Sequence, residues 1–379
     1  MKPTVLIFRK RLLPWSETFI AAQGRALKRY HPVFVGYQRD PAGAAYLDGC
    51  EQILLSDHEP LPGVAIGKAL LKVAGRVPRS WLRALEATRP RLVHAHFATS
   101  AQPALRLAEA LRLPLVMTFH GHDIAKTPRN RAHAERRRAL FTRVDRAIAV
   151  SDFIADRLRE AGCPEEKIVV HHIGVDTDRF VPAADAVTTP RVLFVGRLVE
   201  KKGLDHLLRA FPAVLKRVPG AELVIVGDGP LRARHASLAA SLDVPARFVG
   251  VQTPDEVHGW LRASQVLAAP SVVTGTGDAE GLPVTIMEAL ATGLPVVAFP
   301  SGGSADGVRD GETGFLVGPG DETGLADAIV RVLSEAPLRT AMSAAARRLA
   351  LDRFSISQQT TELERIYDEV LGQAGVCLC

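Results

Sequence analysis

The 379-residue sequence predicts an α/β protein made of two doubly wound, Rossmann-like domains. Short runs rich in Val, Ile, Leu and Phe alternate with amphipathic segments of helix length, a pattern typical of buried parallel strands joined by crossover helices. The alternation stops in a Pro- and Ala-rich stretch at 182–189 and then starts again. A chain of this length is expected to hold two or three domains, and 47% apolar residues suffice for their cores.

Each half supplies six candidate strands. Those of the first half lie at 4–8, 32–36, 92–97, 114–119, 146–150 and 168–172. Those of the second half lie at 191–195, 222–226, 246–249, 265–269, 295–299 and 314–317. A final helix is predicted over 358–372, because Leu363, Ile366, Tyr367 and Val370 recur at helical spacing. We therefore expect an acceptor domain over 1–184, a donor domain over 185–357, and a helical segment, 358–379, that returns to the first domain.

Charge is distributed unevenly along the chain. The net charge is +6, but residues 1–185 carry 29 Lys and Arg against 19 Asp and Glu, and the remainder carries 18 against 22. Nucleic acid is disfavoured as a partner, because no aromatic platform or groove-reading motif accompanies the basic charge. Four cysteines without paired spacing, an N-terminal segment that resembles a strand more than a signal peptide, and the lack of a membrane-length apolar run favour a cytoplasmic protein.

The strand ends of the second half are rich in glycine and charge, and open α/β sheets bind ligands at these ends. Gly196 allows a tight turn after the first strand, and Arg197 and Lys202 follow before a helix begins. An anion held there would gain amide donors, the helix dipole and two cations, which suits a pyrophosphate. A solvated basic loop is the alternative. The third strand ends near Gln252, where backbone amides are placed to read the edge of a nucleotide base.

The most specific signal is a pair of glutamates eight residues apart. Glu280 precedes a Gly-Leu-Pro turn, and Glu288 lies inside the helix that follows. Carboxylates bind vicinal sugar hydroxyls well, because each oxygen accepts from an OH group, and the free amides at the helix start can hold phosphate or sugar oxygens. Two surface glutamates are a poor alternative, since Glu288 stands in an apolar run where an unpaired carboxylate is costly.

The motifs Gly-Arg-Leu-x-x-x-Lys-Gly, Val-Gly-Asp-Gly-Pro and Glu-x7-Glu resemble, in order and spacing, those of the retaining, nucleotide-sugar-dependent glycosyltransferases of group 1 (family 4). The resemblance covers nearly the whole chain and implies the GT-B architecture, two facing Rossmann-like domains with a cleft between them. It implies that Arg197 and Lys202 neutralise the diphosphate of a UDP-sugar or GDP-mannose donor. Glu288 would bind the ribose hydroxyls, and Glu280 would hold the transferred sugar together with Gly281, Leu282 and Pro283. No cofactor and no metal are implied.

The first half departs from many relatives after its first strand, where Ser16, Glu17 and Thr18 replace a glycine-rich loop. This departure resembles the branch that builds exopolysaccharides of the colanic-acid type, in which Ser-Glu-Thr-Phe opens the first helix. The resemblance suggests contacts of these three residues with the acceptor or the sugar, and an ordinary N-cap role for Ser16 is the alternative. By resemblance His120, which ends the fourth strand, approaches the donor sugar. A purely structural histidine is the competing interpretation.

Metal binding is not expected. His94, His96, His120 and His122 lie near two strand ends, but nothing in their spacing enforces tetrahedral geometry. The segment 176–178 has the Asp-x-Asp form of the metal motif of single-domain glycosyltransferases, yet the family that this chain resembles has a structural turn there.

The basic excess of the first half concentrates in two segments, 64–85 and 126–143. Their candidate membrane contacts are Lys68, Lys72, Arg76, Arg136, Arg137 and Arg138. A basic amphipathic helix can lie in an anionic lipid surface, where each cation contributes about 1 kcal/mol. An ordinary solvated helix face explains the charge equally well.

Together these features predict transfer of a hexosyl group from a nucleoside-diphosphate sugar, with retention, in surface or exopolysaccharide biosynthesis. The acceptor would be a hydroxyl of a glycan or of a polyprenyl-diphosphate-linked saccharide, and the enzyme would work at the inner face of the cell membrane. A sugar-nucleotide 2-epimerase of the same architecture and a non-catalytic glycan- or lipid-binding scaffold are the alternatives. The set of two cations and two glutamates argues against the first, and the intact donor motifs argue against the second.

Overall fold

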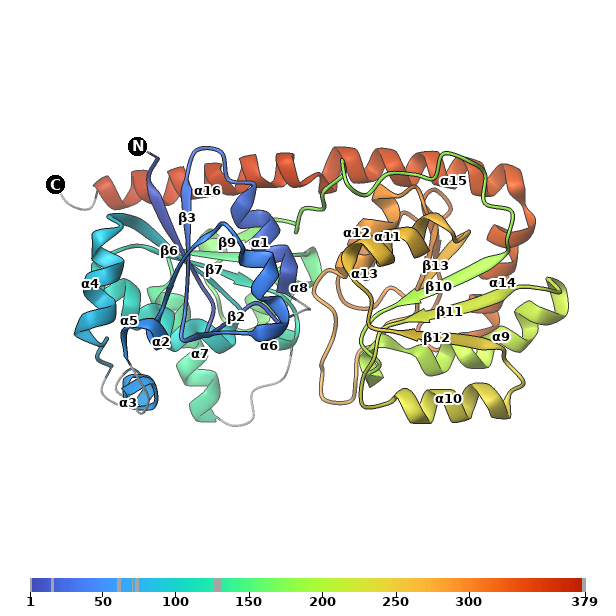
Figure 1. Ribbon diagram of the computed structural model, residues 1–379, viewed down its shortest axis with the longest axis horizontal. Helices are drawn as coiled ribbons and strands as arrows, with labels where there is room; N and C mark the ends of the chain where they lie inside the picture. The colour runs from blue at the N-terminus through green and yellow to red at the C-terminus, as the bar shows by residue number, and fades with distance from the viewer. Residues whose placement is uncertain are drawn as a thin grey trace. The chain divides into compact units, whose positions relative to one another are not determined.

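The computed structural model describes residues 2–14, 17–59, 63–69, 71, 75–125 and 131–376. The chain divides into two compact units. Unit 1 comprises Met1–Gly174 and Ile356–Cys379, and unit 2 comprises Val175–Ser355. Each unit is a doubly wound α/β domain (Figure 1), so the predicted fold class is confirmed for both.

The boundary between the units lies ten residues before the expected position at 184. The turn at 176–180 belongs to unit 2, because the Arg347 guanidinium donates hydrogen bonds to the carbonyl oxygens of Thr177 (3.0 Å) and Phe180 (2.8 Å). The last helix belongs to unit 1 and begins at Ile356, two residues before the predicted start.

Unit 1 contains a seven-stranded parallel sheet in the order β5-β3-β1-β6-β7-β8-β9. Its strands are β1 (Thr4–Phe8), β3 (His31–Gly36), β5 (Glu51–Leu54), β6 (Pro90–His96), β7 (Leu115–Phe119), β8 (Arg146–Ala149) and β9 (Ile168–Val170). Six of them match predicted strands to within two residues. The edge strand β5 was missed because two of its four residues are not buried, and the short strands β2 (Arg11–Leu12) and β4 (Gln38–Arg39) form a separate pair.

The helices of unit 1 are α1 (Thr18–Arg25), α2 (Leu55–His58), α3 (Gly63–Ala69), α4 (Arg79–Ala87), α5 (Ala101–Leu111), α6 (His122–Ala125), α7 (Arg131–Arg143), α8 (Asp152–Glu160) and α16 (Ile356–Val376). The basic segment 64–85 is therefore not one helix. Gly75 has a positive φ of 64° and Pro78 is the N-cap of α4, so the chain breaks between α3 and α4. Among the described residues, every helix lacks the length or the apolar content needed to cross a bilayer.

Unit 2 contains six parallel strands in the order β12-β11-β10-β13-β14-β15. They are β10 (Arg191–Val195), β11 (Glu222–Val226), β12 (Ala246–Gly250), β13 (Val266–Ala269), β14 (Val296–Ala298) and β15 (Gly314–Leu316), each within one residue of its prediction. Its helices are α9 (Leu204–Arg217), α10 (Arg232–Ser241), α11 (Pro254–Arg262), α12 (Val284–Ala291), α13 (Ser304–Gly307), α14 (Glu322–Ser334) and α15 (Ala336–Leu349). The strand order reverses between β10 and β13 in unit 2 and between β1 and β6 in unit 1, and Rossmann folds bind ligands at such switch points.

Helix α16 is fixed to unit 1 by a buried carboxylate. Glu364 is 2% exposed, and its Oε1 accepts the backbone N–H groups of Lys28 (2.7 Å) and Arg29 (2.6 Å). Its Oε2 accepts from Arg29 Nε at 3.2 Å. These two amides lie in the connection between α1 and β3, where no helix or ladder partner satisfies them, so the last helix of the chain completes the hydrogen bonding of an early turn.

We predict that Glu364→Ala lowers the free energy of unfolding by about 1–3 kcal/mol, because it leaves the amides of Lys28 and Arg29 without their acceptor, whereas the Arg29 guanidinium keeps its ion pair with Asp368 at 2.6 Å. Urea denaturation followed by circular dichroism measures the change. The matched control is Glu362→Ala on the same helix. Glu362 pairs with Arg365 at the surface, where such a pair contributes at most about 1 kcal/mol. Equal losses in the two variants would contradict the role given to Glu364.

Candidate functional site

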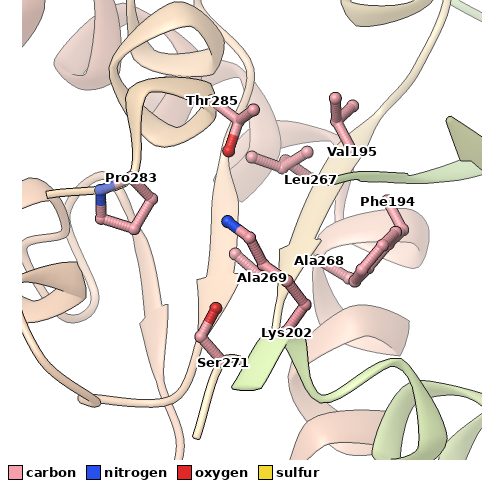
Figure 2. A pocket seen from close by; sticks show the side chains of 9 residues that line it. All are labelled: Phe194, Val195, Lys202, Leu267, Ala268, Ala269, Ser271, Pro283 and Thr285. Atoms are coloured by element: carbon pink, nitrogen blue, oxygen red, sulfur yellow. The ribbon is translucent and has the colours of Figure 1, made fainter. Parts of the chain in front are cut away.

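A small pocket lies at the switch point of unit 2, where β10 and β13 end (Figure 2). The lining residues are Phe194, Val195, Lys202, Leu267, Ala268, Ala269, Ser271, Pro283 and Thr285. Most of them are apolar, and the polar groups are one ammonium and two hydroxyls. The pocket is small, so it suits one group of a ligand rather than a whole nucleotide sugar.

Two glycines let the loop after β10 bring Lys202 into this pocket. A Cβ atom on Gly196 would lie 3.3 Å from both Cδ and Cε of Lys202, so the glycine leaves room for the lysine side chain. Gly203 has φ +66° and a Cβ there would lie 1.8 Å from the carbonyl oxygen of Pro270, which follows β13. Only glycine permits this close approach, which packs the loop against the end of the neighbouring strand.

The polar groups of the pocket gather beside the start of α12. In Figure 2 the Lys202 side chain extends across the pocket, and the hydroxyls of Thr285 and Ser271 flank its ammonium in this view. Pro283 is the N-cap of α12, and no side chain caps the helix. The positive end of the helix dipole therefore adds to the lysine charge, an arrangement that favours an anion such as a phosphate. The hydroxyl residues Ser271 and Thr285 had been given no role from the sequence.

Glu280 is held by two ammonium groups. Its Oε2 lies 3.2 Å from Nζ of Lys202, and its Oε1 lies 3.3 Å from Nζ of Lys201, which is also 3.5 Å from Oδ1 of Asp278. Burial alone would raise the pKa of Glu280, but the charges of Lys202 and Lys201 outweigh it and lower this pKa. The carboxylate is therefore ionised and its direction is fixed. Nothing in the sequence identified Lys201 and Asp278, since their role exists only in the folded loop.

Glu288 has the opposite environment, although it follows Glu280 by only eight residues. Among the described residues, no group donates a hydrogen bond to its carboxylate or forms an ion pair with it. Burial raises the pKa of Glu288 to about 7, and the charge of Arg179 opposes this rise only weakly. The Arg179 guanidinium is already bound to Asp255 at 2.7 Å. A partly desolvated carboxylate of this kind gains from ligand hydroxyls that donate to it.

The other residues predicted for the donor site differ in their exposure and in their contacts. Arg197 is exposed on the loop after β10, and no residue that the structure describes pairs with its guanidinium. Gly281 and Leu282 are buried in the turn before α12. The Gln252 side-chain amide donates to the carbonyl oxygens of Val249 and Val251, both at 3.1 Å. Gln252 therefore stabilises its own loop.

At the switch point of unit 1, Arg9 joins the loops after β1 and β6. Its Nε and Nη2 each donate to one carboxylate oxygen of Glu17 at 2.7 Å. Its Nη1 donates to the hydroxyls of Thr99 (3.1 Å) and Ser100 (3.2 Å). Both Glu17 oxygens thus bind Arg9 and the residue is 7% exposed, so Glu17 fixes the loop structure. Its predicted contact with acceptor or sugar stays a prediction. Arg9 was not predicted as a site residue.

Glu17 is also the N-cap of α1, although its side chain makes no capping hydrogen bond. Thr18 is the first residue of this helix and is partly exposed. Ser16, the alternative N-cap, lies outside the described residues. The predicted contacts of Thr18 and Ser16 with acceptor or sugar stay predictions.

His120 follows β7, the strand beside β6 in the sheet. Its Nε2 lies 3.0 Å from Nδ1 of His96, and its ring packs against those of Phe97 and Phe19, with centroids 4.4 and 5.0 Å away. Phe97 has φ +64°, a left-handed conformation that is costly for a residue other than glycine. Such strain persists only where the surroundings enforce it, and it is most frequent at functional sites.

Asp123 fixes the backbone around this histidine. Its Oδ2 accepts the N–H of Ala98 (2.7 Å), and its Oδ1 accepts those of His120 (3.1 Å) and Gly121 (2.9 Å). One carboxylate thus ties the loop after β7 to the loop after β6. An aspartate four residues beyond a strand end was a usable signal for such a role, because Asp side chains commonly accept nearby backbone amides.

The Asp-x-Asp segment forms a turn. The carboxylate of Asp176 accepts the backbone N–H groups of Asp178 (3.1 Å) and Arg179 (3.0 Å), the pattern of an Asx turn. Across the described part of the chain, no three His, Cys, Asp or Glu side chains are arranged to hold a metal ion.

The basic residues considered for membrane contact do not share one helix face. Lys68 donates to Gln38 Oε1 at 2.9 Å, and its ammonium lies 5.5 Å from the centroid of the Tyr37 ring. Arg76 is exposed between α3 and α4. On α7, Arg138 is exposed, whereas burial and the neighbouring charge of Arg138 lower the pKa of Arg137. Lys72 and the side chain of Arg136 lie outside the described residues.

The raised pKa of Glu288 predicts a pH-dependent stability. Between about pH 4.5 and 7 the folded state keeps a proton on Glu288 that the unfolded chain has lost, so this residue makes the free energy of unfolding fall as the pH rises. Glu288→Gln removes this contribution. The stability of the variant relative to wild type should rise by about 1–2 kcal/mol from about pH 5 to about pH 8, measured by chemical denaturation at each pH.

Glu280→Gln is the control, and its stability relative to wild type should change with pH in the opposite direction. Because the folded-state pKa of Glu280 is lowered, its ionised form stabilises the fold at neutral pH, and this contribution is lost as the pH falls through the lowered pKa. The loss of stability in Glu280→Gln should therefore shrink on acidification. A difference between Glu288→Gln and wild type that is constant with pH would refute the assignment.

Comparison with protein families gives a match on each unit. Residues 189–335 match the family model described as glycosyl transferases group 1, and residues 9–179 match the model of glycosyltransferase family 4. Solved structures of similar fold include Anabaena HepE in complex with UDP and glucose, with a TM-score of 0.78 and 19% identity over 97% of this chain and 100% of that one. Sucrose-phosphate synthase from Thermosynechococcus elongatus has a TM-score of 0.75 and 21% identity over 98% and 100% of the two chains. These likenesses confirm the GT-B fold.

Several curated proteins are similar to this chain in sequence. The chain is 35% identical over 238 residues to the putative colanic acid biosynthesis glycosyltransferase WcaL of Escherichia coli (strain K12), which is 61% of this chain and 59% of that protein. The chain thus spans less than two thirds of the length of this relative. It is 34% identical over 265 residues to the GDP-mannose-dependent alpha-(1-6)-phosphatidylinositol monomannoside mannosyltransferase of Mycolicibacterium smegmatis (66% and 69%). It is 30% identical over 309 residues to the D-inositol 3-phosphate glycosyltransferase of Corynebacterium aurimucosum (74% and 72%). With a family match on each unit and relatives aligned over more than two thirds of their length, the chain belongs to the group 1, family 4 glycosyltransferases.

Proposed function

We propose that this protein transfers a hexosyl group from a nucleoside-diphosphate sugar to a hydroxyl of a glycan acceptor, with retention at the anomeric carbon. The observation that carries the proposal is the Lys202 ammonium in the pocket at the end of β10, beside the uncapped start of α12. A lysine, two hydroxyls and the positive end of a helix together suit the diphosphate of such a donor.

The donor is held by groups with distinct tasks. Lys202 and Arg197 stabilise the charge that develops on the leaving diphosphate, so they act mainly on the transition state. Glu288 accepts hydrogen bonds from the ribose hydroxyls, and Glu280 accepts them from the transferred sugar. When Lys202 turns to the diphosphate, Lys201 still lies 3.3 Å from Glu280 and keeps that carboxylate ionised.

The chemical step is a front-face substitution. The acceptor oxygen forms a bond to the anomeric carbon on the face from which the diphosphate leaves, and the electrons of the broken C–O bond go to the diphosphate. The proton of the acceptor hydroxyl passes to an oxygen of the leaving diphosphate. Glu280, paired with two ammonium groups, is a poor nucleophile, which supports this route over a covalent intermediate on that carboxylate.

Substrate classes follow from the relatives by analogy. Relatives are named as glycosyltransferases of colanic acid and amylovoran biosynthesis and as GDP-mannose-dependent mannosyltransferases, and a structural neighbour was solved with UDP-glucose. We propose a UDP-sugar or GDP-mannose as donor. As acceptor we propose a glycan or a polyprenyl-diphosphate-linked saccharide in exopolysaccharide biosynthesis.

The test uses a panel of UDP- and GDP-sugars. The matching donor should raise the melting temperature of the wild-type protein, because a ligand that binds only the folded state stabilises it by mass action. Transfer from that donor should fall about 30- to 1,000-fold in kcat in Lys202→Ala and in Arg197→Ala, the cost of removing one charge-stabilising group. Radiolabelled sugar incorporated into an acceptor extract measures this rate.

Lys216→Ala is the matched control, since Lys216 is an exposed lysine in the last turn of α9, far along the helix from the pocket loop. It should keep wild-type binding and turnover. Normal turnover in Lys202→Ala at saturating donor would refute the proposal. Formation of an altered free sugar nucleotide without acceptor would instead establish an epimerase, and lack of thermal protection by every donor would indicate a non-catalytic scaffold.

A lipid-linked acceptor also requires contact with a membrane surface, and we propose that unit 1 makes it at the inner face of the cell membrane. Ile66 on α3 is 56% exposed, and Arg76 is exposed beyond the end of this helix. An exposed apolar residue and an exposed cation on the same segment of the chain suit an anionic lipid surface.

We expect co-sedimentation with vesicles that contain anionic lipid at low salt, and release at high salt because salt screens the attraction. The double variant Ile66→Ser/Arg76→Ser should bind several-fold less. Leu351→Ser/Arg348→Ser removes an exposed apolar residue and an exposed cation from unit 2 and should bind like wild type. Wild-type protein that stays in solution at low salt would show that the basic charge of unit 1 is only solvated.

A further inference from the structure

Four charged side chains form a cluster beside the pocket of unit 2. Lys201 and Lys202 lie in the short 3-10 turn Glu200–Lys202 after β10. Asp278 and Glu280 lie in the segment that follows β13, and the four side chains are between 13% and 21% exposed. Charges that are largely shielded from water are costly unless they are paired, and here two cations balance two carboxylates.

The two lysines are neighbours in the chain but have different surroundings. Lys202 lines the pocket, whereas Lys201 is not among its lining residues. Each ammonium reaches a different oxygen of Glu280, Lys202 at Oε2 (3.2 Å) and Lys201 at Oε1 (3.3 Å). Lys201 has a second carboxylate, Asp278, at 3.5 Å, and among the described residues Lys202 pairs with Glu280 alone. Lys202 is therefore placed to serve a ligand, and Lys201 is placed to serve Glu280.

Backbone hydrogen bonds hold Lys201 and Asp278 in this arrangement. The carbonyl oxygen of Lys201 accepts the N–H of Val272 at 2.8 Å, so the loop after β10 is joined to the segment after β13. Thr274 fixes Asp278, because its Oγ1 accepts the Asp278 N–H (3.1 Å) and its own N–H donates to the Asp278 carbonyl oxygen (3.0 Å). The ion pair of Lys201 and Asp278 thus connects two segments that are already bound to each other, and Lys201 is directed at Glu280 before any ligand enters.

Glu280 depends on this cation once an anion is in the pocket. Its Oε1 is buried and has no partner of hydrogen-bond geometry among the described residues, so it relies on the charge of Lys201. A diphosphate would draw the Lys202 ammonium away from Oε2 and would add negative charge nearby, and both effects favour the protonated form of a buried carboxylate. Glu288 shows the outcome for a carboxylate without an ion pair, since burial raises its pKa to about 7.

We infer that Lys201, anchored by Asp278, is a positioning residue that keeps Glu280 charged and in place while Lys202 is released to the diphosphate. The inference rests on the proposed function, because the anion is the diphosphate of a nucleotide-sugar donor. Lys201 itself contacts neither this diphosphate nor the reacting atoms. It allows Lys202 and Glu280, which are paired in the absence of a ligand, to act on different parts of the donor.

Calorimetric titration with UDP and with GDP tests the inference. Titrations at about pH 6 in buffers of different ionisation enthalpy give the number of protons that the protein takes up on binding. Lys201→Met should take up more protons than wild type, by roughly half a proton to one, because Glu280 is then left without a cation. Lys201→Met/Glu280→Gln should show no such excess over Glu280→Gln, since the carboxylate that takes up the proton is missing.

Lys216→Met is the matched control, because it removes an exposed ammonium from the last turn of α9 in the same unit. It should take up as many protons as wild type, and so should Lys201→Arg, which keeps a cation beside Glu280. With the matching donor, Lys201→Met should lower kcat about tenfold at about pH 6 and about threefold at about pH 8. Lys201→Arg should recover most of the loss. A role of Lys201 in folding alone would not depend on pH in this way.

A proton count in Lys201→Met equal to that of wild type, or an excess that persists without Glu280, would overturn the inference. If Lys201→Met does not fold, carbon-13 NMR of the glutamate carboxyl groups in wild type decides. The Glu280 signal, identified by its loss in Glu280→Gln, should remain that of an ionised carboxylate at about pH 6 with UDP or GDP bound, and a protonated one would overturn the inference.

The same titrations separate this inference from the proposed function. Wild type that binds neither UDP nor GDP would refute the proposed function and the inference with it. Binding with equal proton counts in wild type and Lys201→Met would refute the inference alone.

Discussion

The direction of the parallel strands is the constraint on which both candidate sites depend. Every strand of the two large sheets runs the same way, so all loops that follow strands collect at one edge of each sheet. Where the strand order reverses, two neighbouring loops diverge and leave room between them. Lys202 reaches this point in unit 2 and Arg9 reaches it in unit 1, each on the loop after the first strand of its sheet. Both candidate sites lie at such edges, because the reversal of strand order opens space between the loops there.

Burial and neighbouring charges give different protonation behaviour to residues that look alike in the sequence. Glu280 and Glu288 flank the same turn, yet two lysines lower the pKa of the first and burial raises that of the second. Unit 1 shows the same principle in Arg9 and Glu17, where a paired carboxylate becomes part of the scaffold. A carboxylate that is paired with a cation of the protein stabilises the loop structure and contributes to the local electrostatic potential. An unpaired carboxylate is available for a ligand.

The sequence predicted what depends on periodicity and on short motifs. Twelve strands followed from apolar runs, and the loop carrying Lys202 and the turn carrying Glu280 were identified together because both follow strands of one sheet. The missed features depend on tertiary contacts that no spacing encodes. Arg9 meets Glu17 through an irregular loop, and Asp123 joins two loops that are about 25 residues apart in the chain. Gly75 and Pro78 already indicate a break in the basic segment, but the regular spacing of its cations suggested one continuous helix.

The path of the chain through the two units also bears on how the protein is made. Unit 2 is contiguous, whereas unit 1 is interrupted after Gly174 and resumes at Ile356. During synthesis unit 2 can therefore finish folding while unit 1 still exposes the amides of Lys28 and Arg29 and the imidazole of His94 that α16 will cover. A ribosome that stops before α16 would release a folded second unit attached to an incomplete first one, a product that protein quality control is expected to remove. Unit 1 therefore folds late, because its structure is complete only after the last helix has been translated.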